Sequence, residues 1–340
     1  MEVLFMEYRI LDKSNLQISR LGLGGIPLQR ASASEVVTLL SAAYDAGINF
    51  IDTARGYTAS EELIGQGLQS RRAAFVLASK SMQRSKEGIL SDIRLSLKNL
   101  RTDYLDLYQL HNVRTQAEWE IVSAPDGALA GLFEAQQAGL VRQIGITSHS
   151  ADMMAKALDS GLFATMMFPY NVVENHNKQL FATAHQKGMS TLAMKPLAGG
   201  FIPDAGQALR YLAANPNVDC ILAGMASPAE IEANVRALQR GPLAPEEVQE
   251  LENWAKQAGQ EFCRRCGYCL PCPQGIDIPM VFLLEGYYDR YELQGWARDR
   301  YAALPVPGTA CQACGQCEQK CPYGLPIPAK LARAAGKLGS

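Results

Sequence analysis

The sequence has no excess of basic residues, no long hydrophobic run and almost no cysteine in its first 260 residues. Its formal net charge of −2 gives it no general attraction for nucleic acid or for an anionic membrane. No apolar run approaches the roughly 20 residues that a membrane-spanning helix needs. The first residues, MEVLFMEYRILDKSN, mix acidic with apolar residues and lack the apolar core of a signal peptide. We therefore expect a cytoplasmic protein with no nucleic-acid or membrane partner.

Eight of the nine cysteines lie in the last quarter of the chain, and only Cys220 precedes them. Thiols stay reduced in the cytoplasm, so grouped cysteines indicate metal ligands rather than disulfides. Cys220 lies within the apolar run VDCILAG. We expect it to be a core residue outside the group.

Residues 16–240 alternate between short apolar runs and amphipathic helical patterns. The strand candidates are residues 19–25, 48–53, 74–80, 105–111, 141–147, 164–168, 189–195 and 218–224. Several intervening helical segments end at a glycine just before the next strand, as in DAGINF and QKGMSTL. Eight strand–helix units predict an α/β fold of the (β/α)8 TIM-barrel type over residues 1–260. An open doubly wound sheet fits this layout less well. LGLGG lacks the G-x-G-x-x-G spacing of a nucleotide-binding loop, so we interpret its glycines mainly as strand residues.

Polar side chains occur where three consecutive strand candidates end. Asp52 closes the second candidate, Lys80 the third and His111 the fourth, and Tyr57 follows Asp52 by five residues. A TIM barrel gathers the carboxyl ends of its strands at one mouth. We therefore expect the four side chains to form one site, although each alone also fits a structural role.

These residue types suit proton transfer. A tyrosine titrates near pH 10 when unperturbed, which is too high for easy proton donation at neutral pH. A nearby ammonium favours the phenolate, and a carboxylate keeps that ammonium charged and oriented. The pattern predicts that Tyr57 protonates an oxygen as hydride reaches a carbonyl carbon, while His111 polarises the carbonyl.

The segments GINFIDTARGY, ASK, YLDLYQLH and GLVRQIGITSH resemble, in this order, the signature motifs of the aldo-keto reductase superfamily. The resemblance covers residues 8–240. It implies a (β/α)8 barrel that passes hydride between a nicotinamide cofactor and a carbonyl substrate. It also matches Asp52, Tyr57, Lys80 and His111 to the catalytic tetrad of that family, with Tyr57 as the general acid.

The resemblance further implies a set of cofactor contacts, several of which depart from the family's pattern. By position these contacts are Ser148, His149, Met194, Lys195, Leu197, Gly199, Gly224, Ser227, Glu230 and Asn234. His149 stands where asparagine is usual, and Met194 replaces the tyrosine that usually stacks on the nicotinamide. Met167 stands where many members have a glutamine that binds the carboxamide.

Glu230 bears on the choice of dinucleotide. Together with Ser227 it forms a capping-box pattern at a helix start, which explains both residues without a ligand. Relatives that use NADP have an arginine at this position and a lysine at that of Gly224. A carboxylate would repel a 2′-phosphate and accept hydrogen bonds from a free ribose hydroxyl. We expect NAD rather than NADP, and the departures around the nicotinamide leave a flavin as a further alternative.

The cysteines form two runs in residues 261–340. The second run, Cys311-x2-Cys314-x2-Cys317-x3-Cys321-Pro, is the bacterial ferredoxin pattern for [4Fe–4S] ligation, in which the fourth cysteine binds the partner cluster. The first run holds Cys263, Cys266, Cys269 and Cys272 and is one residue shorter before its last cysteine. We expect Cys263, Cys266, Cys269 and Cys321 to hold one cluster, and Cys311, Cys314, Cys317 and Cys272 the other. Zinc is the alternative, since zinc sites with four cysteine ligands also use Cys-x2-Cys pairs.

Residues 261–340 are thus predicted to form a small α-helical ferredoxin-like domain with two [4Fe–4S] clusters. A helix over 244–259 precedes it, and a helical connector over 281–301 separates the cysteine runs. The whole chain resembles the iron–sulfur branch of the aldo-keto reductases.

The functional hypothesis is a nicotinamide-dependent oxidoreductase for a small carbonyl or alcohol substrate. One-electron transfer through the clusters, to or from a redox partner protein, would be coupled to its hydride chemistry. One alternative is a plain NAD(P)H-dependent carbonyl reductase with structural clusters. Another is a redox sensor or electron carrier.

Overall fold

The computed structural model describes residues 5–11 and 16–339, which divide into two compact units. The first unit comprises Met1–Pro196 and Asp204–Val248, and the second comprises Leu197–Pro203 and Gln249–Ser340. The domain boundary after residue 260 stays a prediction. The second compact unit begins earlier, at Gln249, and also includes the segment Leu197–Pro203. No helix within the described ranges is long and apolar enough to cross a membrane.

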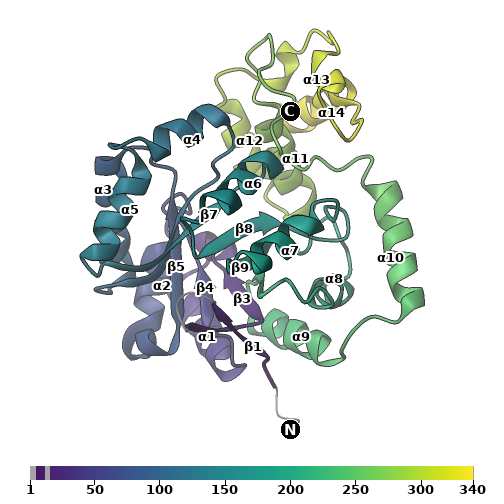
Figure 1. Ribbon diagram of the computed structural model, residues 1–340. Coiled ribbons are helices and arrows are strands. Elements are labelled where there is room, and N and C mark those ends of the chain that lie inside the picture. The colour runs from purple at the N-terminus through teal and green to yellow at the C-terminus, as the bar shows by residue number, and fades with distance from the viewer. Residues whose placement is uncertain (1–4, 12–15, 340) are drawn as a thin grey trace. The chain divides into compact units, whose positions relative to one another are not determined.

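The first unit is built on a closed barrel of parallel strands in the order β10-β3-β4-β5-β6-β7-β8-β9 (Figure 1). Its strands are β3 (Leu21–Gly24), β4 (Phe50–Asp52), β5 (Val76–Ser81), β6 (Leu105–Leu110), β7 (Val141–Thr147), β8 (Thr165–Pro169), β9 (Ser190–Met194) and β10 (Cys220–Gly224). Each strand overlaps one of the predicted strands, so the predicted TIM barrel is confirmed.

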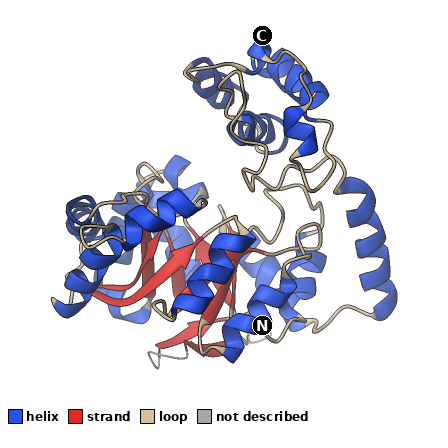
Figure 2. Ribbon diagram, turned by 45° about the horizontal axis from the view of Figure 1, so that its top comes forward, coloured by secondary structure: helices blue, strands red, loops and turns tan. Residues whose placement is uncertain are grey.

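Helices follow the strands along the chain and lie around the barrel (Figure 2). They are α1 (Ala33–Asp45), α2 (Ser60–Leu68), α3 (Lys86–Leu100), α4 (Gln116–Ser123), α5 (Ala128–Gln137), α6 (Ala151–Ser160), α7 (Lys178–Gln186), α8 (Ala205–Ala213) and α9 (Pro228–Gln239). Two 3-10 helices, η1 (Pro27–Arg30) and η2 (Gln69–Ala74), complete the unit. The helices bury their apolar faces against the strands in one large hydrophobic core.

An antiparallel hairpin, β1 (Tyr8–Leu11) and β2 (Leu16–Ser19), precedes the barrel and was not predicted. Its Leu11 and Ile18 are fully buried in a hydrophobic cluster that they share with strand residues. Cys220 belongs to the same cluster and is fully buried, which confirms its prediction as a core residue.

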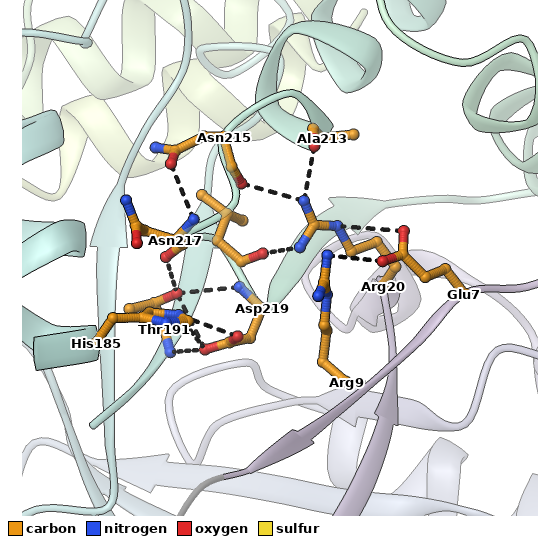
Figure 3. A network of polar contacts seen from close by, with 10 residues as sticks. Glu7, Arg9, Arg20, His185, Thr191, Ala213, Asn215, Asn217 and Asp219 are labelled. Carbon is orange, nitrogen blue, oxygen red and sulfur yellow. Dashed lines mark hydrogen bonds and ion pairs between the residues drawn. The ribbon is translucent and has the colours of Figure 1, made fainter. Parts of the chain in front are cut away.

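A polar network connects the amino ends of β3, β9 and β10 (Figure 3). Arg20, just before β3, donates from Nη2 to the main-chain oxygen of Ala213, at 2.8 Å. Asp219, just before β10, accepts a hydrogen bond of 2.7 Å from the main-chain nitrogen of Thr191 and lies 3.1 Å from His185 Nε2. These contacts join the strand ends opposite the predicted site, so we assign them to the stability of the barrel.

The second unit is helical. It holds most of α10 (Pro245–Ala258), then α11 (Ile278–Arg290), α12 (Gln294–Ala302), η3 (Gly308–Ala310), α13 (Gln316–Gln319) and α14 (Ile327–Leu338). The helix predicted over 244–259 is present as α10. The connector over 281–301 is helical but divided in two, and Glu292, between the two helices, has a φ of 55°. Helix α14 was not predicted.

Candidate active site and cluster-binding cysteines

The barrel brings the predicted catalytic side chains together at the carboxyl ends of β4, β5 and β6. Lys80 Nζ donates to Asp52 Oδ2 and, at 2.8 Å, to the main-chain oxygen of Thr53. The same Nζ lies 4.8 Å from the centroid of the Tyr57 ring. The rings of Tyr57 and His111 meet edge to face, with their centroids 6.0 Å apart. One ammonium therefore contacts both the carboxylate and the phenol, as proton transfer by Tyr57 requires.

The Asp52–Lys80 pair is buried, with Asp52 4% and Lys80 2% exposed. Burial by itself lowers the pKa of Lys80, but the charges of Asp52 and Tyr57 outweigh burial and raise this pKa. Lys80 therefore keeps its positive charge at neutral pH. Such a buried charge would be costly without its partner, so the two residues depend on each other.

His111 is held as a neutral imidazole. Burial lowers its pKa well below the usual value, and the charges of Lys80 and Arg84 add to the shift. Its Nδ1 is buried and has no hydrogen-bond partner among the described residues. Arg84 holds this part of the chain by donating from Nη2 to the main-chain oxygens of His111 and Asn112, at 3.0 and 3.1 Å.

The loop that carries Tyr57 is fixed by a buried carboxylate that was not predicted. Glu61 is fully buried in α2, and its Oε1 accepts hydrogen bonds of 2.7 Å from both Ser79 and Ser96. Its Oε2 accepts from Arg55, which lies two residues before Tyr57. The segment DTARGYTASEE could have indicated this ion pair. Its Arg55 precedes Tyr57 on the loop, and its Glu61 follows in the first turn of a helix.

The predicted carboxamide contacts follow β7. The Ser148 hydroxyl donates to the main-chain oxygen of Val113, at 2.6 Å, so towards a ligand it would act mainly as an acceptor. His149 Nδ1 lies 3.0 Å from Asn112 Oδ1, next in the chain to His111. The His149–Asn112 pair therefore connects the end of β7 to the end of β6, beside His111 of the predicted catalytic set.

Four of the cysteines line one cavity of the second unit. The cavity is bounded by Cys263, Cys266 and Cys269 of the first run, by Cys321 of the second, and by apolar residues including Phe282. These are the four residues predicted to share a cluster. Burial raises the pKa of the Cys269 thiol to about 12, and the neighbouring Cys263 and Cys266 add to this.

The two cysteine runs also approach each other at the second predicted ligand set. Gln274, two residues after Cys272, donates a hydrogen bond of 3.2 Å to Gln312, which follows Cys311. Cys272, Cys311 and Cys317 lie partly buried against the hydrophobic core of the second unit. Three of the four cysteines predicted for the second cluster thus pack against one hydrophobic core.

Comparison with known proteins identifies both units. Residues 20–207, more than half of the chain, match the aldo/keto reductase family. The chain belongs to this family. Residues 262–325 match a 4Fe-4S dicluster domain. The resemblance inferred from the motifs is confirmed for both parts of the chain.

Individual relatives match over most of their length. The uncharacterized oxidoreductase YqkF of Bacillus subtilis is 25% identical over 305 residues, which cover 74% of this chain and 97% of that protein. L-galactose dehydrogenase of Arabidopsis thaliana is 28% identical over 285 residues, covering 68% and 88%. The solved holo form of aldo-keto reductase AKR11C1 from Bacillus halodurans superposes with a TM-score of 0.65 at 26% identity, covering 73% of this chain and 96% of that one.

Further predicted cofactor contacts of the reductase barrel lie at the ends of β9 and β10. Lys195 follows Met194 with a φ of 59°, and its main-chain oxygen accepts a hydrogen bond of 3.0 Å from the buried Asn171. Asn171 was not predicted, although it lies two residues after β8, at the end of the motif MMFPYN. The hydrogen bond from Asn171 holds Lys195 in its left-handed backbone conformation. Strained conformations of this kind are common at ligand-binding sites.

The start of α9 carries the residues predicted near the ribose and adenine. Ser227 Oγ accepts a hydrogen bond of 3.3 Å from the main-chain nitrogen of Glu230. Glu230 Oε2 in turn accepts one of 2.7 Å from the main-chain nitrogen of Ala226, one residue before the N-cap, so only the Ser227 half of the predicted capping box is formed. Gly224 ends β10, and Asn234 is buried on the helix. Glu230 itself is exposed, so its carboxylate remains accessible.

Leu197 and Gly199 belong to the second compact unit rather than to the barrel unit. The main-chain oxygen of Gly199 accepts a hydrogen bond of 2.9 Å from Arg290 at the end of α11. Sequence reasoning placed both residues in the cofactor loop after β9 and gave no sign of this contact, which depends on tertiary packing.

The dicluster domain fits iron–sulfur clusters better than zinc. Residues 262–325 match a 4Fe-4S dicluster domain, not a zinc-binding family. Cysteines placed around a cavity suit a cluster, whose several irons each take one thiolate.

Proposed function

We propose that this protein is an oxidoreductase that transfers hydride between a nicotinamide cofactor and a small carbonyl or alcohol substrate. In this proposal its clusters exchange single electrons with that reaction or with a redox partner protein. The observation that carries the hydride part is the contact of the buried Lys80 ammonium with both Asp52 and the ring of Tyr57. No purely structural role requires a charged lysine beneath a tyrosine at a barrel mouth.

The bound dinucleotide supplies or accepts the hydride. The chain's own residues transfer the proton and bind the substrate oxygen. Tyr57 donates its hydroxyl proton to that oxygen during reduction and takes it back during oxidation. Lys80 stabilises the phenolate that remains. His111, neutral at working pH, holds the carbonyl oxygen by a hydrogen bond.

We further propose NAD as the preferred dinucleotide, because the accessible Glu230 carboxylate would repel a 2′-phosphate. Ser148, His149 and Lys195 would hold the nicotinamide end, and Ser227 and Asn234 the adenosine end. Met194 offers the nicotinamide a flexible apolar contact instead of an aromatic one. This looser contact leaves a flavin as the competing cofactor, which its visible absorbance would reveal.

For the clusters we propose the crossed ligand sets predicted from the sequence. Cys263, Cys266, Cys269 and Cys321 hold one cluster; this set lines the cavity described above. Cys311, Cys314, Cys317 and Cys272 hold the other. A purely structural role for the clusters is the second candidate, because Cys269 is part of the small hydrophobic core of this unit and five further cysteines pack against that core.

Anaerobic purification followed by iron and sulfide counts, and by EPR after addition of NADH or NADPH, tests these proposals together. We expect about eight irons per chain and a reduced-cluster signal after NADH in the presence of added flavin, which can take the hydride and pass its two electrons on singly. Full cluster content without any change of cluster redox state would support the structural role.

The Tyr57→Phe variant tests the hydride site separately. It should lose about 100- to 10,000-fold in aldehyde reduction, the usual contribution of a general acid, and keep its iron. Tyr44→Phe, at an exposed position on α1, is the matched control and should keep full activity. Unchanged turnover in Tyr57→Phe would refute catalysis by this site.

A further inference from the structure

Gln109 is a fully buried glutamine near the carboxyl end of barrel strand β6. In the barrel it pairs in register with Lys80 on β5 and with Gly145 on β7. Its position is therefore level with the catalytic lysine, two residues before His111.

The amide of Gln109 makes one described hydrogen bond. Its Nε2 donates to Asp52 Oδ1 at 3.0 Å, while its Oε1 is buried and has no partner among the described residues. A buried carbonyl oxygen without a partner destabilises a fold. An apolar side chain of similar length would avoid this cost, so packing does not explain why an amide stands here.

The barrel makes room for this side chain. A Cβ atom at position 145 would lie 3.0 Å from Gln109 Cγ and 2.3 Å from Thr165 Oγ1. Glycine at 145 is therefore required for Gln109 and Thr165 to occupy their places. The glutamine is accommodated by its neighbours and is directed at one acceptor.

That acceptor is the carboxylate that orients Lys80. Asp52 receives Lys80 on Oδ2 and Gln109 on Oδ1, so each carboxylate oxygen has one donor. Burial favours the neutral form of Asp52, and both donors oppose it. Without the amide, Asp52 could take the proton of Lys80, and the pair would become neutral.

We propose, on the basis of the proposed hydride-transfer function, that Gln109 is a positioning residue for the reaction. It holds the Asp52 carboxylate ionised and oriented, which keeps the Lys80 ammonium beside Tyr57. Gln109 touches neither substrate nor cofactor in this role. It acts through Asp52 and Lys80 on the acidity of the Tyr57 hydroxyl.

The test is the pH dependence of aldehyde reduction in Gln109→Met, which keeps the side-chain length and removes the donor. We expect kcat to fall about tenfold, equivalent to about 1.4 kcal/mol in the barrier, with KM for 4-nitrobenzaldehyde unchanged. The alkaline limb of the profile should move to higher pH by about one unit, because a neutral Lys80 no longer favours the phenolate.

Thr165→Val is the matched control, since it removes another buried polar atom without a described partner, the Thr165 hydroxyl, and does not touch Asp52. It should leave the rate and the alkaline limb unchanged. If Gln109→Met does not fold, Gln109→Asn serves instead: its shorter side chain withdraws the amide from Asp52, and the same shift is expected.

A folded Gln109 variant whose alkaline limb stays at the wild-type pH would overturn the proposal, whatever its rate. Wild-type protein that reduces no aldehyde with either dinucleotide would instead refute the proposed function. The two failures are therefore distinguishable.

Discussion

Phe201, seven residues after β9 in the sequence, packs against Phe262, the residue before Cys263. The two ring centroids lie 5.0 Å apart at an interplanar angle of 36°, and the ring centroid of Trp254 in α10 lies 5.8 Å from that of Phe201. The segment Leu197–Pro203 is thus part of the compact unit that carries the cysteines. A segment between two barrel elements in the sequence contributes to the packing next to Cys263.

Phe201→Ala should therefore weaken cluster retention. The substitution removes the aromatic contact of the partly buried Phe201 with Phe262, the residue before Cys263. We expect faster loss of the cluster's visible absorbance on exposure to air, measured against wild type. Phe201→Leu keeps most of the side-chain volume, so its absorbance should decay at a rate between those of wild type and Phe201→Ala. Equal decay in all three proteins would show that this stack does not support the cluster.

The crossed ligand sets predict which cysteine serves which cluster. Cys321→Ser should empty the site that it shares with Cys263, Cys266 and Cys269, and Cys272→Ser should empty the other site. Each variant should keep about four irons per chain instead of about eight. Cys220→Ala, in the barrel core, is the control and should keep all of them.

The uncrossed arrangement gives a different pattern in a double variant. If each run served its own cluster, Cys263→Ser with Cys321→Ser would damage both clusters. With crossed sets it damages one and leaves about four irons in place. Iron and sulfide analysis of the double variant therefore decides between the two arrangements.

The barrel was predictable because its signals are local. Each strand is a short apolar run, and glycines with positive φ, such as Gly47 and Gly188, stand at the helix ends before the next strand. The hairpin β1–β2 was missed because its four-residue strands offer too short an alternation to separate from a loop. Helix α14 could have been found, since Ile327, Leu331 and Leu338 recur at helical spacing.

The site was predictable only in part. Asp52, Tyr57, Lys80 and His111 are brought together as expected, because topology alone puts strand ends at one mouth. Gln109 and Glu61 were not found, because a polar residue in a strand or helix does not reveal whether it is buried or what it faces. Their partners, Asp52 and Arg55, are set by side-chain packing across the barrel and its loops.

His111 should remain neutral across the physiological range. Its pKa is lowered in the folded protein, so the unfolded chain binds a proton below about pH 6.5 while the folded one does not. Stability from this group is therefore complete above about pH 6.5 and falls as the pH drops, by at most about 1.4 kcal/mol per unit.

Nitrogen chemical shifts of 15N-histidine-labelled protein should show one imidazole that does not titrate between about pH 8 and 5.5. The signal should disappear in His111→Gln, and this variant should lose less stability than wild type between about pH 7.5 and 5.5. A His111 resonance that titrates near the unperturbed value of about 6.5 would contradict the neutral assignment.

Glu230→Gln should change the choice between dinucleotides. The amide removes the negative charge that opposes a 2′-phosphate, yet its oxygen can still accept the hydrogen bond from Ala226, just before the start of α9. We expect the ratio of kcat/KM for NADPH over NADH to rise about 5- to 10-fold at low ionic strength, which corresponds to about 1 kcal/mol of repulsion between exposed charges. The gain should shrink in about 0.5 M salt, because screening already weakens that repulsion in the wild type.

Glu232→Gln provides the control for this change. Glu232 is exposed on the same helix and pairs with Arg236 through an Nη2–Oε1 contact of 2.8 Å. Its substitution alters the net charge by the same amount, so a general charge effect would raise the NADPH ratio in both variants alike. A rise confined to Glu230→Gln would place the ribose 2′-hydroxyl of the dinucleotide beside this carboxylate. If the NADPH/NADH ratio of kcat/KM were the same in wild type and Glu230→Gln, the basis for preferring NAD would be removed.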